Sequence, residues 1–316
     1  GETANAFTYT LNDGTKASNY DITTTEGTLK VTELTAKVTV TITEHGGSEK
    51  YDGKEKTVTG YEVEISNDLY KSTDFTFNGN ATIKGTDAGS YAMELKPEDF
   101  TNISKNFSDV EFVIVDGTLE ISKRSVTLTS ATQEKVYDGT ALTNDEVVVS
   151  GDGFAEGEGA SYDVTGTITE VGETANAFSY ILNEGTKADN YEITKVEGTL
   201  TVTEMTAKVT VTITENSGSY MYDGAEHTAS GYEVTNISND LYKTGDFTFS
   251  GNDKVTGTDA GTYDMELKAS DFTNNSKNFS NVEFVIVDGT LTISKRPVTL
   301  TSADDEKVYD GTALTN

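Results

Sequence analysis

The sequence predicts an all-β chain of tandem immunoglobulin-like β-sandwich domains, arranged as an elongated rod. Two stretches that begin at Gly1 and Gly172 are nearly identical, so the chain is a tandem array. Apolar residues alternate with threonines in segments such as residues 37–43, which is the two-residue period of a half-buried strand. No Gly/Ser-rich or Pro-rich linker separates the modules, so we expect neighbouring domains to hold fixed angles.

The array alternates two kinds of repeat. Each opens on a strand that leads to a Tyr-Asp-Gly motif, found at residues 51–53, 137–139, 222–224 and 309–311. Each closes on an acidic residue followed by Gly-Thr-Leu, found at residues 26–29, 116–119, 197–200 and 288–291. The predicted domains are the C-terminal half of a short repeat (1–33), long repeat 1 (34–123), the complete short repeat (124–204), long repeat 2 (205–294) and the N-terminal part of a short repeat (295–316).

The two incomplete short repeats have two explanations. The chain is a window cut from a longer array, or its end segments complete a split domain between neighbouring molecules. The second explanation resembles strand complementation, in which a partner supplies the missing strands of a sheet. It predicts a filament subunit whose copies join head to tail.

About seven short strands are expected in each long repeat, bounded by Gly, Asn and Asp. Residues 112–115 are apolar on both faces, which predicts a strand that is covered on both sides. Asp116-Gly117 then suits either a tight hairpin turn or a glycine bulge within one continuous strand. Residues 96–100 are the helix candidate, because a proline is tolerated near a first turn.

The topology is indicated by residues 87–93, which recur as residues 259–265. They are similar to the tyrosine corner of immunoglobulin-type sandwiches, with Met93 at the position of the second cysteine of antibodies. A tyrosine hydroxyl that bonds to backbone would fix this corner. A β-grasp-like mixed sheet is the alternative fold.

Composition excludes several functions. The chain has 53 acidic and 23 basic residues, for a net charge of −30, which repels nucleic acid and anionic membranes. It has no cysteine, so disulfides, thiol catalysis and thiolate metal sites are excluded. No apolar run is long enough to cross a membrane, so we expect no direct membrane insertion of this segment. A tandem period without a unique constellation of polar residues also argues against an enzyme.

The motifs of residues 134–140 and 289–295 resemble the YDG and MBG-type repeats of large bacterial surface proteins. Every repeat carries such ends, although Lys54 and Ala225 stand where the motif prefers threonine. The resemblance implies a stalk or adhesive module outside the cell, between a tip and an anchor, and implies no catalytic residue.

A calcium site is the first candidate chemistry, because calcium takes several carboxylate and carbonyl oxygens. Asp152, Glu156 and Glu158 lie between glycines, and Asp304 and Asp305 lie near a module boundary. Calcium there would stiffen the rod by bridging charges that repel one another. Solvated turn residues are the alternative, since none of these carboxylates has EF-hand spacing.

An internal Lys–Asn isopeptide bond is the second candidate. Lys37 and Lys208 open the apolar strands, from which each can reach an asparagine on a neighbouring strand. The reaction requires a buried, deprotonated lysine. The alternative is that both side chains point to solvent.

Sugar binding is the third candidate, because Tyr20, Tyr70, Tyr191 and Tyr242 lie in polar, turn-rich segments where rings can stack on a ligand. The alternative is that these tyrosines pack in the core. His45 and His227 fall at unequal places in their repeats, which argues against a shared histidine site.

Three functions follow from these observations. The first is a stiff acidic spacer of a bacterial cell-surface adhesin, whose three complete domains span about 100 Å at ~3.3 Å per strand residue. The second is the filament subunit. The third is an adhesin repeat that binds a host glycan or protein directly. The expected partners are neighbouring repeats, other copies head to tail and a host ligand.

Overall fold

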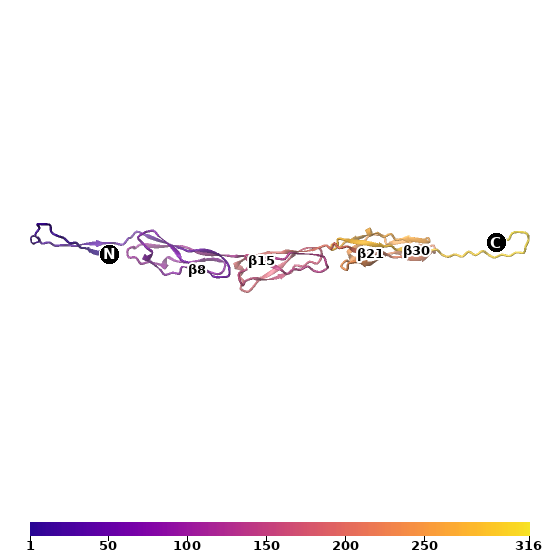
Figure 1. Ribbon diagram of the computed structural model, residues 1–316, viewed down its shortest axis with the longest axis horizontal. Helices are drawn as coiled ribbons and strands as arrows, with labels where there is room; N and C mark the ends of the chain where they lie inside the picture. Colours follow the sequence, from indigo (N-terminus) through magenta and orange to yellow (C-terminus); the bar gives the residue numbers. More distant parts are fainter. The chain divides into compact units, whose positions relative to one another are not determined.

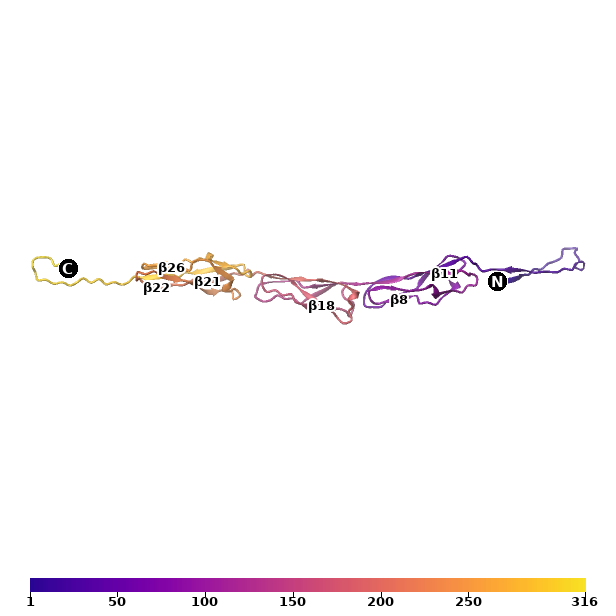
Figure 2. The same ribbon diagram turned by 180° about the vertical axis from the view of Figure 1, so that it is seen from behind.

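A computed structural model describes all 316 residues, which form β-strands, short 3-10 turns and loops, with no α-helix (Figures 1 and 2). The chain falls into two compact units. Unit 1 comprises residues 1–129, 149–162 and 180–196, and unit 2 comprises the rest. Each unit therefore holds one long repeat and part of the complete short repeat. None of the helical turns is long and apolar enough to span a membrane.

The elements follow the order of the repeats. In residues 1–123 they are β1 (Glu2–Asn5), η1 (Ala17–Asn19), β2 (Gly27–Lys30), β3 (Val38–Glu44), β4 (Gly47–Lys50), β5 (Lys56–Thr59), β6 (Tyr61–Ile65), η2 (Ser72–Asp74), β7 (Phe75–Phe77), β8 (Thr82–Gly85), β9 (Gly89–Ala92), η3 (Pro97–Asp99), β10 (Phe100–Asn102), β11 (Val110–Val115) and β12 (Thr118–Ser122). In residues 124–204 they are β13 (Arg124–Ser130), β14 (Gln133–Val136), β15 (Val147–Gly151), β16 (Ala160–Val164), β17 (Gly172–Asn176), β18 (Phe178–Leu182), η4 (Ala188–Asn190), β19 (Tyr191–Val196) and β20 (Gly198–Thr203). In residues 205–316 they are β21 (Val209–Glu215), β22 (Gly218–Met221), β23 (His227–Ser230), β24 (Tyr232–Ile237), η5 (Thr244–Asp246), β25 (Phe247–Phe249), β26 (Lys254–Gly257), β27 (Gly261–Asp264), η6 (Ala269–Asp271), β28 (Phe272–Asn274), β29 (Val282–Val287) and β30 (Thr290–Ser294).

The first and last strands of long repeat 1 lie side by side. β3 pairs in parallel with β11 and antiparallel with β6, while β4 pairs in parallel with β12, which pairs antiparallel with β9. Both terminal strands thus pass from one sheet to the other at a bend. Val38, Val40 and Ile42 point inward from β3 and are fully buried. Long repeat 2 repeats this arrangement with β21, β22, β24, β27, β29 and β30.

The bend explains Asp116-Gly117. β11 and β12 do not pair with each other, so the hairpin expectation is wrong. They also belong to different sheets, so the chain at Asp116-Gly117 passes from one sheet to the other instead of forming a bulge within one continuous strand. A Cβ at Gly117 would lie 2.4 Å from the backbone oxygen of His45, so only glycine allows this close approach. These bends also divide the terminal strands in two, so the repeat has ten strands, β3–β12, instead of about seven.

The expectation that residues 112–115 are covered on both faces is wrong. Phe112 and Ile114 point inward, whereas Val113 and Val115 are 38% and 45% exposed. The outer face of this sheet is open to solvent. On it, β-branched residues such as valine favour the strand conformation although they are not buried.

The tyrosine corner is confirmed in both long repeats. The Tyr91 hydroxyl donates a 2.8 Å hydrogen bond to the backbone oxygen of Asp87, and Tyr263 bonds to Asp259 in the same way. Met93, at the position of the antibody cysteine, is buried. With sheets that share the first and last strands, this corner identifies an immunoglobulin-like sandwich. The helix candidate at residues 96–100 is a single 3-10 turn, η3, which covers three residues.

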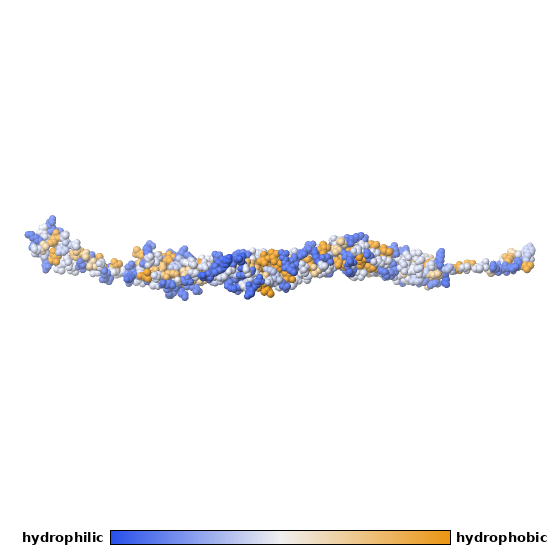
Figure 3. Space-filling model, turned by 60° about the horizontal axis from the view of Figure 1, so that its bottom comes forward, coloured by the Kyte–Doolittle hydropathy of each residue, from blue (hydrophilic) through white to orange (hydrophobic).

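Within each unit, the strands of the short repeat pair in the same pattern as those of the long repeats. In unit 1, β13 pairs in parallel with β19. In unit 2, β20 pairs in parallel with β14 and antiparallel with β17. By contrast, all residues of the segments 1–33 and 295–316 are exposed, and both segments carry hydrophobic residues (Figure 3).

Candidate functional site: the junctions between repeats

The first recurrent site is the contact between long repeat 1 and residues of the short repeat in unit 1, called here the long–short junction. Tyr51, the first residue of a Tyr-Asp-Gly motif, directly follows β4, and its backbone N–H donates to the oxygen of Ser122 at 3.0 Å. Its ring meets that of Tyr191 edge-on, with centroids 5.6 Å apart. Both side chains are almost fully buried. The Tyr-Asp-Gly tyrosine therefore belongs to the contact between repeats.

Asn190 links the two repeats by two hydrogen bonds. Its Oδ1 accepts from the backbone N–H of Ala88 at 2.8 Å, and its Nδ2 donates to Oδ1 of Asp87 at 2.9 Å. Lys187 binds the other oxygen of Asp87 at 2.7 Å. Lys187 and Asn190 together lower the pKa of Asp87. Because Asn190 is fully buried, its loss would leave the Ala88 N–H without a partner.

Glu158 joins the two tyrosines of this junction. One of its carboxylate oxygens accepts from the Tyr51 hydroxyl, and the other accepts from the Tyr191 hydroxyl at 2.6 Å. Burial and then the bond to Glu158 raise the pKa of Tyr51 above its usual range and that of Tyr191 to about 12. Both hydroxyls therefore stay protonated and act as donors at any physiological pH.

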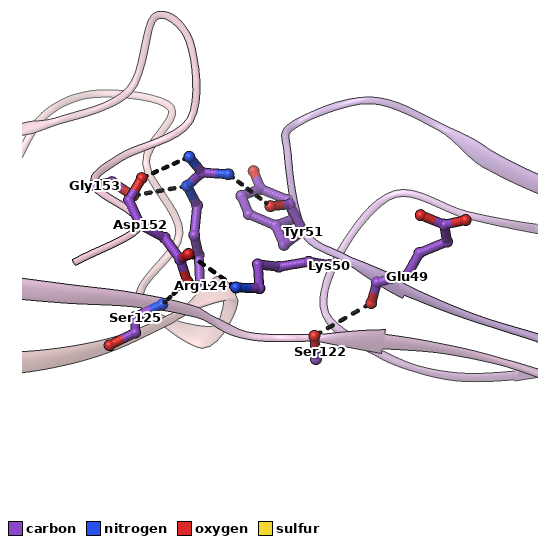
Figure 4. A network of polar contacts seen from close by, with 8 residues as sticks. All are labelled: Glu49, Lys50, Tyr51, Ser122, Arg124, Ser125, Asp152 and Gly153. Atoms are coloured by element: carbon purple, nitrogen blue, oxygen red, sulfur yellow. Dashed lines mark hydrogen bonds and ion pairs between the residues drawn. The ribbon is translucent and has the colours of Figure 1, made fainter.

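A charged cluster surrounds the strand that connects the repeats (Figure 4). Lys50 of long repeat 1 forms an ion pair with Asp152 of the short repeat at 2.8 Å. Arg124 donates to the backbone oxygens of Asp152 and Gly153 on one side and of Tyr51 on the other. A planar guanidinium suits such a bridge, because its donors are fixed in a fork. The pKa of Asp152 is lowered, first by Lys50 and then by the backbone N–H of Ser125.

The second recurrent site, the short–long junction in unit 2, has the same central parts. Asn278 accepts from the backbone N–H of Val171 at 3.0 Å and donates to the carboxylate of Glu170. The rings of Tyr137 and Phe279 meet edge-on, with centroids 5.5 Å apart. Asn278, Glu170 and Tyr137 thus take the places of Asn190, Asp87 and Tyr51.

The short–long junction is the more apolar of the two. Phe279 has no hydroxyl for a carboxylate to bind, and the side chain of Leu241 fills the space next to Gly139. A Cβ at Gly139 would lie 2.7 Å from Leu241 Cδ2, so the glycine of the motif allows this packing. Tyr137 and Phe279 belong to one cluster of buried side chains that continues from the short repeat into long repeat 2.

Two of the five predicted calcium ligands are held in other contacts, and three are exposed. Asp152 is paired with Lys50, and Glu158 accepts from two tyrosines. Asp304 and Asp305 are exposed, and Glu156 is exposed on a loop. The structure assembles no group of three or more His, Cys, Asp or Glu side chains that could hold a metal. Calcium binding stays a prediction, and at Asp152 it requires displacement of Lys50.

The predicted cross-linking lysines lie at equivalent surface positions. Lys37 pairs with Glu111, and Lys208 pairs with Glu283, each at 2.6 Å and with a lysine side chain that is 54% exposed. The hydrogen bond and charge of Glu111 raise the pKa of Lys37, which opposes the deprotonation that the reaction needs. The isopeptide bond stays a prediction without support from this geometry.

The tyrosines considered for sugar binding are mostly core residues. Tyr70, Tyr191 and Tyr242 are at most 4% exposed, so their rings are not available to a ligand, and only Tyr20 is open. The Tyr70 hydroxyl bonds to Asn102, and that of Tyr242 bonds to Asn274. The expectation of stacking platforms is wrong for these three residues.

The linking asparagines were missed by sequence reasoning, although a signal for them exists. An asparagine followed by an aromatic residue recurs at one place in every repeat, at residues 19–20, 106–107, 190–191 and 278–279. Only the structure shows that two of these pairs, at residues 190–191 and 278–279, contact the preceding repeat.

Comparisons with known proteins identify the family of both long repeats. A model of the MBG domain matches residues 36–123 and 208–295, which together make up more than half of the chain. None of the curated proteins compared with the chain matches it significantly.

Solved structures with some likeness include extracellular domains 3–5 of Drosophila OTK. This likeness has 10% identity and a TM-score of 0.17, and covers 85% of this chain and all of that one. The N-terminal four Ig domains of Dscam1 isoform 9.44 give 8% identity and a TM-score of 0.15, with coverage of 82% and 73%. These scores are too low to carry an argument, so the fold assignment rests on the sheet topology and the tyrosine corner.

Proposed function

The chain belongs to the MBG domain family, and from this premise we propose that it is the spacer region of a bacterial surface adhesin. It acts by spanning distance and presenting another part of the protein. The observation that carries this proposal is that one set of contacts recurs at both junctions. In each, a buried asparagine binds an acidic residue and a backbone N–H of the preceding repeat, beside a Tyr-Asp-Gly tyrosine. We call this set of contacts the interlock. A surface that only covered a core would not need the same asparagine, acidic residue and tyrosine each time.

The interlock is suited to holding an angle. The asparagine of each junction makes two hydrogen bonds to adjacent residues of the preceding repeat, and both are lost if the repeats turn relative to each other. A buried amide left without partners costs about 1–3 kcal/mol, so each junction resists bending. Repeats of this kind interact with their nearest neighbours and build length in one dimension.

The composition supports a location outside the cell. The net charge of −30 favours solubility of an extended chain and discourages lateral association. Because the chain has no cysteine, its sandwiches keep their fold without disulfides, with Met93 at the position of an antibody cysteine. We place the spacer on a bacterial surface for these reasons.

Small-angle X-ray scattering of the whole chain tests the proposal. We expect a radius of gyration well above the ~20 Å of a compact domain of this length, with the scattering profile of a stiff particle. The double variant Asn190→Ala, Asn278→Ala should be as folded by circular dichroism but more flexible. Asn252→Ala, which removes a bond to Lys254 within the same repeat, is the matched control. A compact particle, or wild-type flexibility equal to that of the double variant, contradicts the spacer function.

A second candidate function is assembly of copies into a filament. It is favoured by the exposure of apolar side chains that the complete short repeat buries. Phe7 and Leu29 are 54% and 52% exposed, whereas their counterparts Phe178 and Leu200 are buried. Strands of another repeat, from the same protein or from another copy, would cover these side chains, and a filament requires the second arrangement.

A further inference from the structure

The first and last strands of every complete repeat run side by side in the same direction. In long repeat 1, residues 38–43 lie opposite residues 110–115, and residues 47–50 lie opposite residues 119–122. Long repeat 2 has the same two pairings, β21 with β29 and β22 with β30. In the short repeat, β13 pairs with β19 within unit 1, and β14 pairs with β20 within unit 2. We call these paired first and last strands the parallel ladder.

The direction of the ladder decides how a pulling force acts on a repeat. The chain enters long repeat 1 at Val38, opposite Val110, and leaves it after Ser122. At ~3.3 Å per strand residue, residues 110–122 span up to about 40 Å, so entry and exit lie at opposite ends of the ladder. Tension between them slides the first strand along the last and loads all their hydrogen bonds together. In an antiparallel pair, entry and exit would lie at one end, and the bonds would open one after another.

Further backbone bonds between the same two segments extend the ladder. Before β3, the Leu34 N–H donates to the oxygen of Asn106 at 2.7 Å, and after β4 the Tyr51 N–H donates to that of Ser122 at 3.0 Å. The Tyr-Asp-Gly tyrosine therefore closes the ladder at its far end. The equivalent bonds of long repeat 2 join Met205 to Asn278 and Tyr222 to Ser294, at 2.8 and 2.9 Å.

Successive ladders follow one another without slack. In unit 1, β12 ends at Ser122 and β13 begins at Arg124. In unit 2, β20 ends at Thr203 and β21 begins at Val209, and Met205 between them is itself bonded into the ladder of long repeat 2. A pulling force therefore passes directly from the last strand of one repeat to the first strand of the next.

We propose that the parallel ladder of each complete repeat is a mechanical clamp, which lets the chain bear tension along its length without unfolding. This function goes beyond that of a spacer, which needs length and stiffness but no resistance to pulling. Forced unfolding is governed by the unfolding rate, and therefore by the barrier to unfolding. The clamp raises this barrier for one direction of force, because many bonds must break in the same step.

Pulling long repeat 1 in two directions with optical tweezers tests the clamp in the whole chain. The chain has no cysteine, so handles attach only to introduced ones. Handles in Lys37→Cys, Lys123→Cys slide the first strand along the last. Handles in Lys37→Cys, Glu111→Cys peel the two strands apart, because Lys37 and Glu111 form an ion pair across the start of the ladder.

The peeled ladder should open at less than about half the force that the sliding direction requires, because peeling loads one bonded pair at a time. Both variants lose the same surface ion pair, in which the two side chains are 54% and 48% exposed. Urea unfolding should therefore give them equal stability, so that only the direction of force differs between them.

Two proline variants identify the strand pair that carries the load. Thr41 of β3 lies opposite Val113 of β11 on one side and opposite Glu64 of β6 on the other. Both of these flanking side chains are exposed. Their backbone N–H groups both face β3, because ladder bonds recur at every second residue, counted from the bonds at residues 109 and 66.

Val113→Pro and Glu64→Pro each remove one ladder bond, so we expect similar losses of stability in urea. With handles at residues 37 and 123, Val113→Pro should raise the unfolding rate under load at least about fivefold, as expected for one lost hydrogen bond that breaks in the rate-limiting step. Glu64→Pro should leave this rate close to that of the parent, because its bond to β3 lies outside the parallel ladder.

Equal unfolding forces in the sliding and peeling directions overturn the proposal, and so does a Glu64→Pro variant that weakens the repeat under load as much as Val113→Pro. A chain that scatters as a stiff particle but shows equal forces removes the clamp and leaves the spacer function standing. A flexible chain whose repeats still resist sliding more than peeling does the reverse.

Discussion

Glu44 is a buried carboxylate at the bend where the first strand of long repeat 1 changes sheets. Its two oxygens accept from the backbone N–H groups of Leu95 and Gly117, each at 2.7 Å. Glu215 makes the same two bonds, to Leu267 and Gly289, in long repeat 2. The residue before Leu95, Glu94, has a φ of 64°, which is unfavourable for residues other than glycine. The carboxylate therefore holds together a bent strand and a strained loop.

Glu44→Gln should destabilise long repeat 1 by about 3 kcal/mol. The amide retains one acceptor oxygen, while its NH₂ group faces a backbone N–H that then has no acceptor and stays buried. Urea unfolding measures the change, and Glu62→Gln on the exposed face of the same sheet is the control. A loss below about 0.5 kcal/mol, the usual range for surface substitutions, would show that the carboxylate does not hold the bend.

Residues with a local signature were predictable from the sequence, and residues whose role depends on a distant partner were not. Tyr91 bonds only four residues back, so its motif carries the whole interaction. Asn190 bonds to Asp87 and Ala88, about a hundred residues away, and no local pattern names these partners. Glu158 was assigned to calcium because its acidity was visible and its two tyrosines were not.

At the scale of the elements, the stability of the long–short junction depends on pH through Asp87 and Asp152. Asp87 lies in the loop between β8 and β9, and Asp152 directly follows β15. Each binds a lysine of the other repeat. Their pKa values are lowered in the folded chain from an ordinary 3.8. Their contribution is therefore fully present above the ordinary pKa and is lost as pH falls below it, through the folded values.

Acidification below about pH 4 should loosen the long–short junction before the sandwiches unfold. Hydrogen exchange at the backbone N–H of Ala88, which donates to Asn190, reports on this opening. In the double variant Asp87→Asn, Asp152→Asn, the protection factor of the Ala88 N–H should be lower at neutral pH. This protection factor should then change little on acidification. Protection at Ala88 that persists unchanged to pH 2 would mean that these carboxylates do not hold the junction.

The strands were predicted well where one face is buried and poorly where a strand bends. Val38, Val40 and Ile42 alternate with threonines, and the structure confirms that pattern. The apolar run at residues 112–115 gave the wrong burial, because valine fits an open sheet face as well as a core. The bend at Gly117 depends on its approach to His45, a contact that spacing along the chain does not reveal.

At the scale of the whole molecule, the central question is whether repeats unfold singly or together. In a linear array, cooperativity comes from the contacts between nearest neighbours. Each junction here combines an edge-on aromatic pair with a buried asparagine, and in unit 2 the apolar core is continuous across the contact. Aromatic pairs contribute about 0.5–1.5 kcal/mol beyond their buried area, and each hydrogen bond of the buried asparagine side chain adds a similar amount. This coupling is a large fraction of the 5–15 kcal/mol that stabilises a typical domain.

We therefore expect the complete repeats to melt in one main transition in scanning calorimetry. Asn278→Ala should divide this transition in two, because the Val171 N–H and the Glu170 carboxylate lose their partner and long repeat 2 is uncoupled from the short repeat. Asn190→Ala should uncouple long repeat 1 in the same way, and the double variant should show a separate transition for each repeat. Asn252→Ala, whose bond stays within one repeat, should leave the single transition intact. A wild-type chain that already melts in separate steps would show that the junctions touch without coupling, and an array of that kind would bend at each of them.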